Sequence, residues 1–188
     1  VGLVTDGDWI LAENFQPSGV RLLDVRNIGL GQFVEENKRF ISKERAEELN
    51  CTYVLSGDIL VSRMPEPIGR ACIVPQLPYD CITAVDCTIV RINEEAFDRQ
   101  FLVYRLNSPS ILESVAAVAS GATRQRISRK NLEKIELPIP SLPEQKRIAA
   151  ELKDKITYIE KLKTAVEKQL DTIKALSQTI LRKAFSGE

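Results

Sequence analysis

The chain has 188 residues, of which 44% are hydrophobic and 28% charged, and its 26 basic and 26 acidic side chains cancel to zero net charge at pH 7. This length supports one domain with a hydrophobic core, and no run reaches the roughly 18 apolar residues that a membrane-spanning helix requires. The chain contains no histidine, which removes the commonest general base and the usual partner of a serine or cysteine nucleophile, so composition disfavours catalysis.

The first part of the chain predicts a strand, a polar loop and a short helix. The run GVRLLDVRNIGLGQFV begins as an apolar strand centred on Leu22–Val25 and continues as a loop punctuated by two glycines. Arg26 and Asn27 can project from this loop. Residues 42–49, SKERAEEL, predict a short, strongly charged helix with a solvated face. The first residues lack the basic and apolar segments of a signal peptide, so we expect a cytoplasmic protein.

The middle of the chain, residues 53–91, is the predicted β core. Its segments VLSGDILVSR, GRACIV and CITAVDCTIVRI are rich in β-branched residues and are separated by turn-forming sequences. Pro65 and Pro67 cannot occupy a central strand, so MPEPIG must be an exposed connection. Arg63 and Arg70 flank it. Two arginines at the base of a loop can grip phosphates, or they can be paired surface charges, and the sequence leaves both readings open.

Two amphipathic helices, predicted over residues 94–107 and 108–118, follow the strands and would pack against the sheet. The four cysteines form no CxxC pair, and without histidine a zinc site would need an unusual ligand set. We therefore expect no metal and no cofactor, with the cysteines as reduced, buried small hydrophobes.

The segment SGATRQRIS, residues 120–128, differs from its surroundings. Between residues 121 and 134, five basic side chains face only one acidic side chain, Glu133. Arg124, Gln125 and Arg126 lie in the predicted turn, and Arg and Gln are the side chains that read guanine and adenine edges bidentately. These residues are candidates for DNA contact. A basic loop that packs against the following helix is an equally consistent structural explanation.

A long helix is predicted from Pro143 to Phe185, where no glycine or proline interrupts the chain. Ser141 and Glu144 have the spacing of a capping box, and a proline is tolerated in the first turn of a helix. Apolar residues then recur at steps of three and four, as in an irregular coiled-coil seam. The candidate pairing residues are Leu152, Ile156, Ile159, Leu162, Val166, Leu170, Ile173, Leu176 and Ile180.

The length of this helix argues that it needs a partner. It would measure roughly 64 Å, whereas a globular unit made of the preceding residues would have a radius of gyration of about 14 Å. Such a unit cannot cover the apolar stripe along its whole length, although it could cover the first turns. We therefore predict an α+β fold, with a mixed α/β domain built on a β core at 1–137 and one long coiled-coil helix at 138–188.

At this point the sequence resembles a known family. The run GATRQRISRKNLEKIELPIPSLPEQKRIAAEL, preceded by RLLDVRNIGLGQF, VLSGDILVSR and ITAVDCTIVR, is similar to the specificity subunit of type I restriction-modification systems. The most specific part is PIPSLPEQKRIA, which opens the long helix. Members of that family usually carry two target-recognition domains, each followed by a conserved helical segment, and this chain has one of each. It therefore resembles half of a specificity subunit.

The resemblance implies a function and its partners. Residues 1–137 would be a target-recognition domain that reads one short part of a split target in double-stranded DNA, and residues 138–188 a helical spacer. The candidates for DNA contact would then be Arg124, Gln125 and Arg126, together with Arg63, Arg70 and Asn27. Modification (methyltransferase) subunits would dock on this frame and restriction (endonuclease) subunits would join indirectly, so methylation and cleavage would belong to other chains. A half-length chain could restore the full frame as a homodimer through antiparallel helices, with a palindromic target.

Two other readings remain open from the sequence alone. The chain could be a coiled-coil interaction or scaffold protein without DNA contact, which zero net charge would permit. It could also be an enzyme with Cys81 or Cys87 near Asp86 as the nucleophile, although a cysteine without histidine is a weak candidate. The polarity of helix pairing is also open, because few positions beside the seam carry opposite charges.

Overall fold

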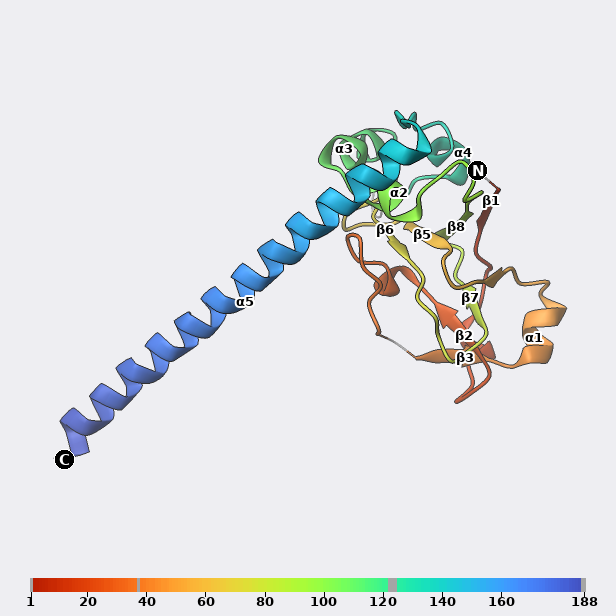
Figure 1. The fold of residues 1–188 in the computed structure, drawn as a ribbon. Coiled ribbons are helices and arrows are strands. Elements are labelled where there is room, and N and C mark those ends of the chain that lie inside the picture. The colour runs from red at the N-terminus through yellow and green to blue at the C-terminus, as the bar shows by residue number, and fades with distance from the viewer. Residues whose placement is uncertain (1, 37, 122–124, 187–188) are drawn as a thin grey trace. The chain divides into compact units, whose positions relative to one another are not determined.

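The computed structural model describes residues 2–36, 38–121 and 125–186 (Figure 1). The chain divides into two compact units, Val1–Lys146 and Arg147–Glu188. The first unit contains two β-sheets with short helices, and the second is part of one long helix. The predicted α+β class is confirmed.

The first sheet is fully antiparallel in its strand pairs. Its order is β1-β8-β5-β6. Ile59 pairs with Val90 on one side and with Ile73 on the other, which places β5 in the interior of the sheet. Its strands are β1 (Leu3–Asp6), β5 (Ile59–Ser62), β6 (Ala71–Ile73) and β8 (Cys87–Arg91).

The second sheet is mixed and has the order β3-β2-β7-β4. Its central pair, β2 with β7, is parallel, with Leu22 opposite Ile82, and the outer strands pair antiparallel. Its strands are β2 (Val20–Leu23), β3 (Arg39–Ile41), β4 (Tyr53–Val54) and β7 (Cys81–Thr83). β2 and β7 are fully buried, as expected for strands that pair on both sides.

The main hydrophobic core lies between the two sheets. Leu60 and Ile89 of the first sheet pack with Leu23 and Cys81 of the second, and all four are buried. Because side chains alternate along a strand, Ile59 and Val61 point to the other face of the first sheet, where they line an apolar cavity of about 200 Å³. The uninterrupted apolar run in β5 is therefore explained by burial on both faces.

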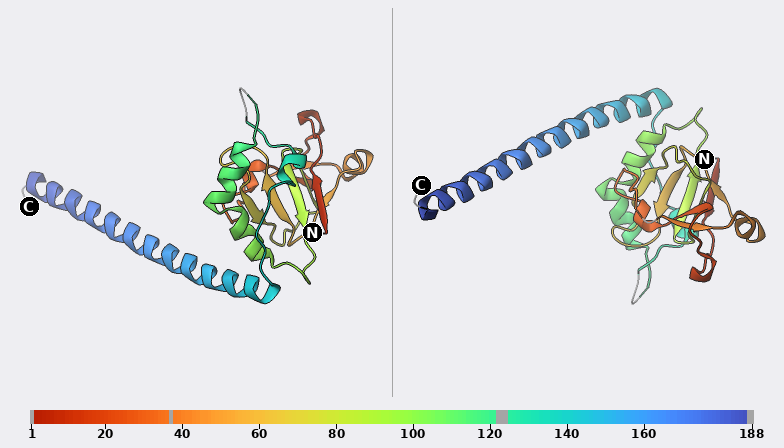
Figure 2. Two further views of the ribbon diagram at one scale, coloured as in Figure 1. Left: turned by 90° about the horizontal axis from the view of Figure 1, so that it is seen from above. Right: turned by 90° about the horizontal axis from the view of Figure 1, so that it is seen from below.

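Helices α2 (Arg99–Leu106) and α3 (Pro109–Ala117) cover that second face (Figure 2). Phe101 and Leu102 of α2 and Val115 of α3 are buried there. Two short helices lie elsewhere in the unit, α1 (Lys43–Glu48) and α4 (Arg129–Leu132), and each has a serine at its N-cap whose side chain accepts a backbone N–H. Single-turn 3-10 helices occupy η1 (Ala12–Asn14) and η2 (Val25–Asn27).

Element boundaries differ from the predictions in two places. The first predicted strand ends at Leu23, because Asp24 caps η2 and turns the chain. The helix predicted over 94–107 begins only at Arg99, after the Asp98 side chain accepts a hydrogen bond from the amide of Phe101 at 2.8 Å. In both cases an aspartate cap fixes the boundary more sharply than the apolar pattern indicated.

The long helix α5 runs over Leu142–Ser186 and has 45 residues. Its first turn is fastened to the first unit by Gln145, which is 1% exposed: Oε1 accepts the amide of Asp98, and Nε2 donates to the carbonyls of Ala96 and Pro140. The compact units consequently divide after Lys146. The functional boundary proposed at 137/138 stays a prediction. Among the described residues, no helix combines the length and apolarity needed to cross a lipid bilayer.

Candidate nucleic-acid interface

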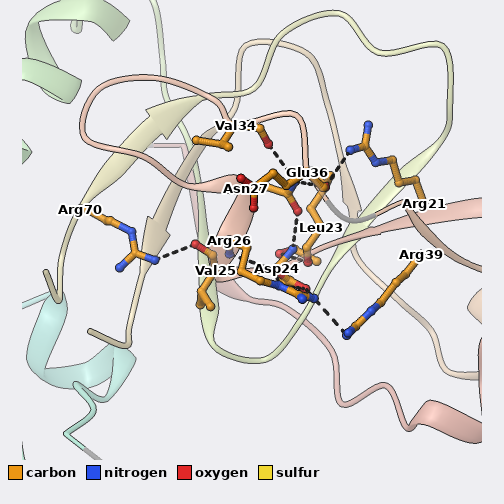
Figure 3. A network of polar contacts seen from close by, with 11 residues as sticks. Arg21, Leu23, Asp24, Val25, Arg26, Asn27, Val34, Glu36, Arg39 and Arg70 are labelled. Atoms are coloured by element: carbon orange, nitrogen blue, oxygen red, sulfur yellow. Dashed lines mark hydrogen bonds and ion pairs between the residues drawn. The ribbon is translucent and has the colours of Figure 1, made fainter. Parts of the chain in front are cut away.

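The polar loop after β2 is organised around Asn27, whose side chain is fully buried. Asn27 Oδ1 accepts the amide of Asp24 at 3.0 Å, and Nδ2 donates to the carbonyls of Val34 and Glu36 at 2.9 and 2.7 Å (Figure 3). One amide side chain thus joins the two ends of the 24–36 loop. Every one of these partners is a backbone group, so the loop shape depends on this asparagine more than on its neighbours' identity.

Arg70 joins this loop to the MPEPIG connection. Its side chain is 9% exposed, and Nε and Nη2 donate to the carbonyls of Ile28 and Val25 at 2.6 and 2.7 Å. Nη1 donates to the carbonyls of Met64 and Pro67 at 3.2 and 3.1 Å. Burial lowers the pKa of the Arg70 guanidinium, although not enough to discharge an arginine. A buried cation therefore holds two loops together through four carbonyl oxygens.

Arg63 has a similar position beneath the 85–86 turn. It is 6% exposed; Nη1 pairs with Asp6 Oδ2 at 3.0 Å and Nη2 donates to the carbonyl of Val85 at 2.6 Å. Its backbone also connects neighbours, because its amide donates to the carbonyl of Asp86 and its carbonyl accepts the amide of Ile127. Arg63 thus fixes the 85–86 turn and the segment after the basic loop to the first sheet.

The three loops held by these residues enclose a hollow of about 390 Å³. We call it the loop hollow and define it by its lining residues, which include acidic, basic and apolar side chains. The lining residues are Asp24, Val25, Arg26, Met64, Pro65 and Asp86.

One wall of the loop hollow carries the pair formed by Arg26 and Asp24. Arg26 Nε lies 3.0 Å from Asp24 Oδ1 and 3.2 Å from Oδ2, and Nη2 also contacts Oδ2 (Figure 3). The same Oδ1 accepts the backbone amide of Arg26 at 2.9 Å. Burial alone would raise the pKa of Asp24, but the hydrogen bonds and charge of Arg26 outweigh it and lower that pKa. The pair is therefore ionised at neutral pH and geometrically fixed.

Further arginines surround this wall. Arg39 Nη1 lies 3.9 Å from Asp24 Oδ2, and its guanidinium is 5.1 Å from the ring centre of Phe15, a cation–π distance. On the opposite side, Arg126 Nη2 lies 2.6 Å from Asp86 Oδ1. Arg26, Arg39 and Arg126 are each about two fifths exposed, at 41%, 43% and 40%. Solvent therefore reaches all three of these guanidinium groups.

The predicted DNA-contact residues thus fall into three groups. Arg126 is accessible beside the loop hollow, and Gln125 is exposed next to it. Asn27, Arg63 and Arg70 are buried, and the side-chain hydrogen bonds that they donate go to loop carbonyls or to Asp6, a geometry that suits positioning of the loops. Arg124 lies outside the described residues. DNA contact by these residues stays a prediction.

The sequence predicted that Arg26 projects from its loop, but neither Arg26 nor Arg39 was among the predicted DNA-contact residues. The usable signal for Arg26 was local: in DVRN, an aspartate two residues earlier can bind both the arginine amide and its guanidinium. Arg39 had no such local signal, because Phe15 and Asp24, its partners, are distant in sequence.

The cysteines offer no nucleophile suited to neutral pH. Burial raises the pKa of the Cys87 thiol to about 12 and that of Cys81 to about 11. Their thiolate populations at pH 7 are therefore very small, which argues against the cysteine-enzyme reading. Among the described residues, no three Cys, Asp or Glu side chains are grouped as metal ligands would be.

The predicted pairing residues on α5 are mostly solvent-exposed in the single chain. From Ile156 to Ile180, the exposed fraction of the stripe's side chains runs from 39% to 62%. The exposed members are Ile156, Ile159, Leu162, Val166, Leu170, Ile173, Leu176 and Ile180, and Leu152 is half-buried. Regularly spaced apolar side chains of this number gain free energy when another helix covers them.

Comparison with known proteins identifies the family of this chain. Residues 9–172 match the model of the type I restriction modification DNA specificity domain. This match covers most of the chain, and the chain therefore belongs to that family, which confirms the resemblance found in the sequence.

Individual relatives agree. The chain is 29% identical over 189 residues to the type I restriction enzyme EcoBI specificity subunit of Escherichia coli, an alignment that spans 100% of this chain and 38% of the relative. The HsdS subunit of Thermoanaerobacter tengcongensis shares the fold, with a TM-score of 0.66, 22% identity and coverage of 98% of this chain and 42% of that one.

A second solved structure, described as the structural basis of complex assembly and conformational transition of the type I R-M system, contains a chain that also shares the fold. Its TM-score is 0.74, with 23% identity and coverage of 97% of this chain and 43% of that chain. The chain thus spans about two fifths of the length of the relatives it matches. The comparisons give no support to a scaffold protein unrelated to DNA recognition.

Proposed function

We propose that this chain reads one short part of a split DNA target for a type I restriction-modification complex. The observation that carries the proposal is the family match over residues 9–172, together with a loop hollow surrounded by accessible arginines in the matched region. Exposed guanidinium groups suit DNA because they attract phosphate and can donate two parallel hydrogen bonds to a base. Residues 1–137 would form the reading domain.

The proposal includes partners that carry the chemistry. The chain would hold modification subunits through its helical segment, 138–188, and restriction subunits would join the complex indirectly. The raised thiol pKa values and the absence of histidine support a recognition subunit without catalysis of its own. A subunit of this kind would act in the cytoplasm, where it meets the DNA.

We further propose that two copies pair through antiparallel α5 helices. The exposed stripe supports pairing, since each of its larger side chains gains on the order of 1.5–3 kcal/mol when buried. At 1.5 Å per residue, α5 is about 67 Å long, which exceeds the roughly 34 Å of one duplex turn. Antiparallel copies would then read two half-sites related by two-fold symmetry.

DNA binding can be measured directly with fluorescently labelled duplex of random sequence. The purified chain, alone and with a modification subunit of a type I system, is titrated at several salt concentrations. We expect binding that weakens as salt rises, and an Arg126→Ala variant whose salt slope is smaller by about 0.9 if Arg126 contacts a phosphate.

The matched control is Arg45→Ala. Arg45 on α1 is about two fifths exposed, as Arg126 is, and it binds Glu48 at 2.9 Å and Asn14 Oδ1 at 2.9 Å. It does not line the loop hollow, so its removal should leave DNA affinity unchanged. Absence of duplex binding in both forms at low salt would overturn the proposed function. Equal affinities of Arg126→Ala and wild type at every salt concentration would show that Arg126 does not contact DNA, and would leave the proposed function standing.

A further inference from the structure

The pairing of Arg26 with Asp24 limits what this arginine can bind. The Asp24 carboxylate occupies the Nε and Nη2 side of the guanidinium, and its side chain is 13% exposed. The backbone amide of Arg26 donates to this carboxylate, and the backbone amide of Asp24 donates to Asn27 Oδ1, so Asp24 is fixed in place. Among the described residues, the hydrogen bonds of Arg26 use Nε and Nη2 and none uses Nη1. The outer edge, Nη1 with the second N–H of Nη2, therefore remains available for two parallel hydrogen bonds.

The charges around the loop hollow distinguish between two acceptors for that edge. A phosphate group that entered the hollow would meet Asp24 and Asp86, which both line it, and would lose much of the attraction of Arg26. A guanine edge carries only the partial charges of O6 and N7 and would meet much weaker repulsion. A carboxylate such as Asp86 can also accept a hydrogen bond from a cytosine amino group, and Met64 and Pro65 supply an apolar wall.

Pre-organisation adds to this preference. An exposed arginine normally loses rotamer freedom when it binds a base, but the Asp24 carboxylate already holds Arg26 in one geometry. Arg39 differs, because it contacts Asp24 only at 3.9 Å and rests on the Phe15 ring. Its charge is less neutralised, which suits contact with a backbone phosphate.

We propose that Arg26, held by Asp24, reads a guanine in the major groove of the target through the O6 and N7 acceptors of that base. This inference rests on the proposed DNA-reading function and specifies it: the half-site contains a guanine whose recognition depends on Arg26. Asp24 is a positioning residue, since it acts through Arg26.

The first test is a selection from duplexes with a fully randomised centre, performed with the chain alone and with a modification subunit. We expect wild type to select a motif that includes guanine, and Arg26→Gln to lose preference for one guanine by roughly 5- to 150-fold. Arg45→Gln removes another carboxylate-paired arginine of similar exposure, one that does not line the loop hollow, and should keep the complete motif.

The second test changes one position of the base, where a C–H group replaces the ring nitrogen N7, and needs no change to the protein. Replacing that guanine with 7-deazaguanine deletes the N7 acceptor, so wild-type affinity should fall while the affinity of Arg26→Gln should not change further. Each protein is compared with itself on the two duplexes, so a difference in stability between wild type and Arg26→Gln does not affect the result.

Asp24→Asn separates positioning from charge. Loss of the carboxylate should lower preference for the same guanine and raise affinity for random-sequence duplex at low salt, because the guanidinium then attracts phosphate more strongly. If Asp24→Asn only disturbed the loop structure, it would weaken binding both to the selected motif and to random-sequence duplex.

The outcomes separate this inference from the proposed function. If wild type selects no motif in either form, the proposed function and the inference fail together. If wild type selects a motif that Arg26→Gln retains, or if 7-deazaguanine weakens wild type and Arg26→Gln equally, the guanine assignment is wrong and the DNA-reading function stands.

Discussion

At the residue scale, Arg70 illustrates how a charged side chain can build a binding surface without touching a ligand. Its guanidinium donates to carbonyls of the 25–28 segment and of the 64–67 segment, and none of the described carboxylates forms a salt bridge with it. Burying an arginine is costly unless its donors are satisfied, and here the carbonyl oxygens of two loops satisfy them. The positions of both walls of the loop hollow therefore depend on one side chain.

Replacement of Arg70 by methionine should destabilise the first unit. The change keeps most of the aliphatic volume but leaves the buried carbonyls of Val25 and Ile28 without donors, which we expect to lower the free energy of unfolding by roughly 1–3 kcal/mol. Urea denaturation measures this difference. Arg45→Met removes a half-exposed ion pair with Glu48 and one hydrogen bond to Asn14, and it should change stability by less, about 1 kcal/mol. Equal decreases in the free energy of unfolding for the two variants would contradict the role of Arg70 in holding the two loops together.

Local and long-range contacts explain which of these residues the sequence could reveal. The arginines flanking MPEPIG could be identified as polar groups at a loop base, but their burial arises from contacts 42 to 57 residues away in the chain, such as those of Arg70 with Ile28 and of Arg63 with Asp6. Helix periodicity is local, and so the apolar stripe of α5 was predictable position by position. The pairing of the strands into two sheets, one of them mixed, was not evident from alternation alone.

At the scale of elements, the start of α5 depends on tertiary hydrogen bonds as well as on its own sequence. The carbonyl of Ser141 accepts the amide of Gln145 at 2.9 Å, as in any first helical turn, while the Gln145 side chain binds three backbone groups of the first unit. One side chain thereby connects the segment before α2 to the beginning of the long helix. Its amide has both the acceptor and the donors that this position requires, unlike a carboxylate or an aliphatic group.

Gln145→Leu should weaken this connection. A leucine fills similar space but leaves the amide of Asp98 and the carbonyl of Ala96 without their partner, so we expect a loss of roughly 1–3 kcal/mol and faster hydrogen exchange at the Asp98 amide. Hydrogen exchange read by NMR gives the local effect. Gln178→Leu is the control, because Gln178 is exposed on α5 and lies outside the apolar stripe. Unchanged protection at Asp98 in Gln145→Leu would show that the hydrogen bond contributes little.

At the scale of the whole molecule, the proposed dimer determines what kind of DNA target the chain can read. An antiparallel pair relates its two copies by a two-fold axis, so each half-site would be the inverted repeat of the other. A parallel, in-register pair of identical helices also has a two-fold axis, but that axis runs along the helices and places both copies of the reading domain at the same end of the pair. Helix polarity is therefore the structural property that decides how far apart the two half-sites lie.

Sedimentation equilibrium and label distances test this pairing together. We expect a dimer mass for wild type and a monomer mass for Ile173→Asp, because a charge within the apolar stripe would be buried on pairing. Lys161→Cys and Arg182→Cys each provide one spin-label site per chain, since the native cysteines are buried. If the two-fold axis lies near Val166, the midpoint of the stripe, a 1.5 Å rise per residue gives label separations of roughly 20 Å at 161 and about 50 Å at 182. A parallel, in-register pair would instead give short and similar separations at both positions, which would contradict the antiparallel arrangement and the wide half-site spacing that follows from it. A monomer mass for wild type at micromolar concentration would contradict the dimer itself.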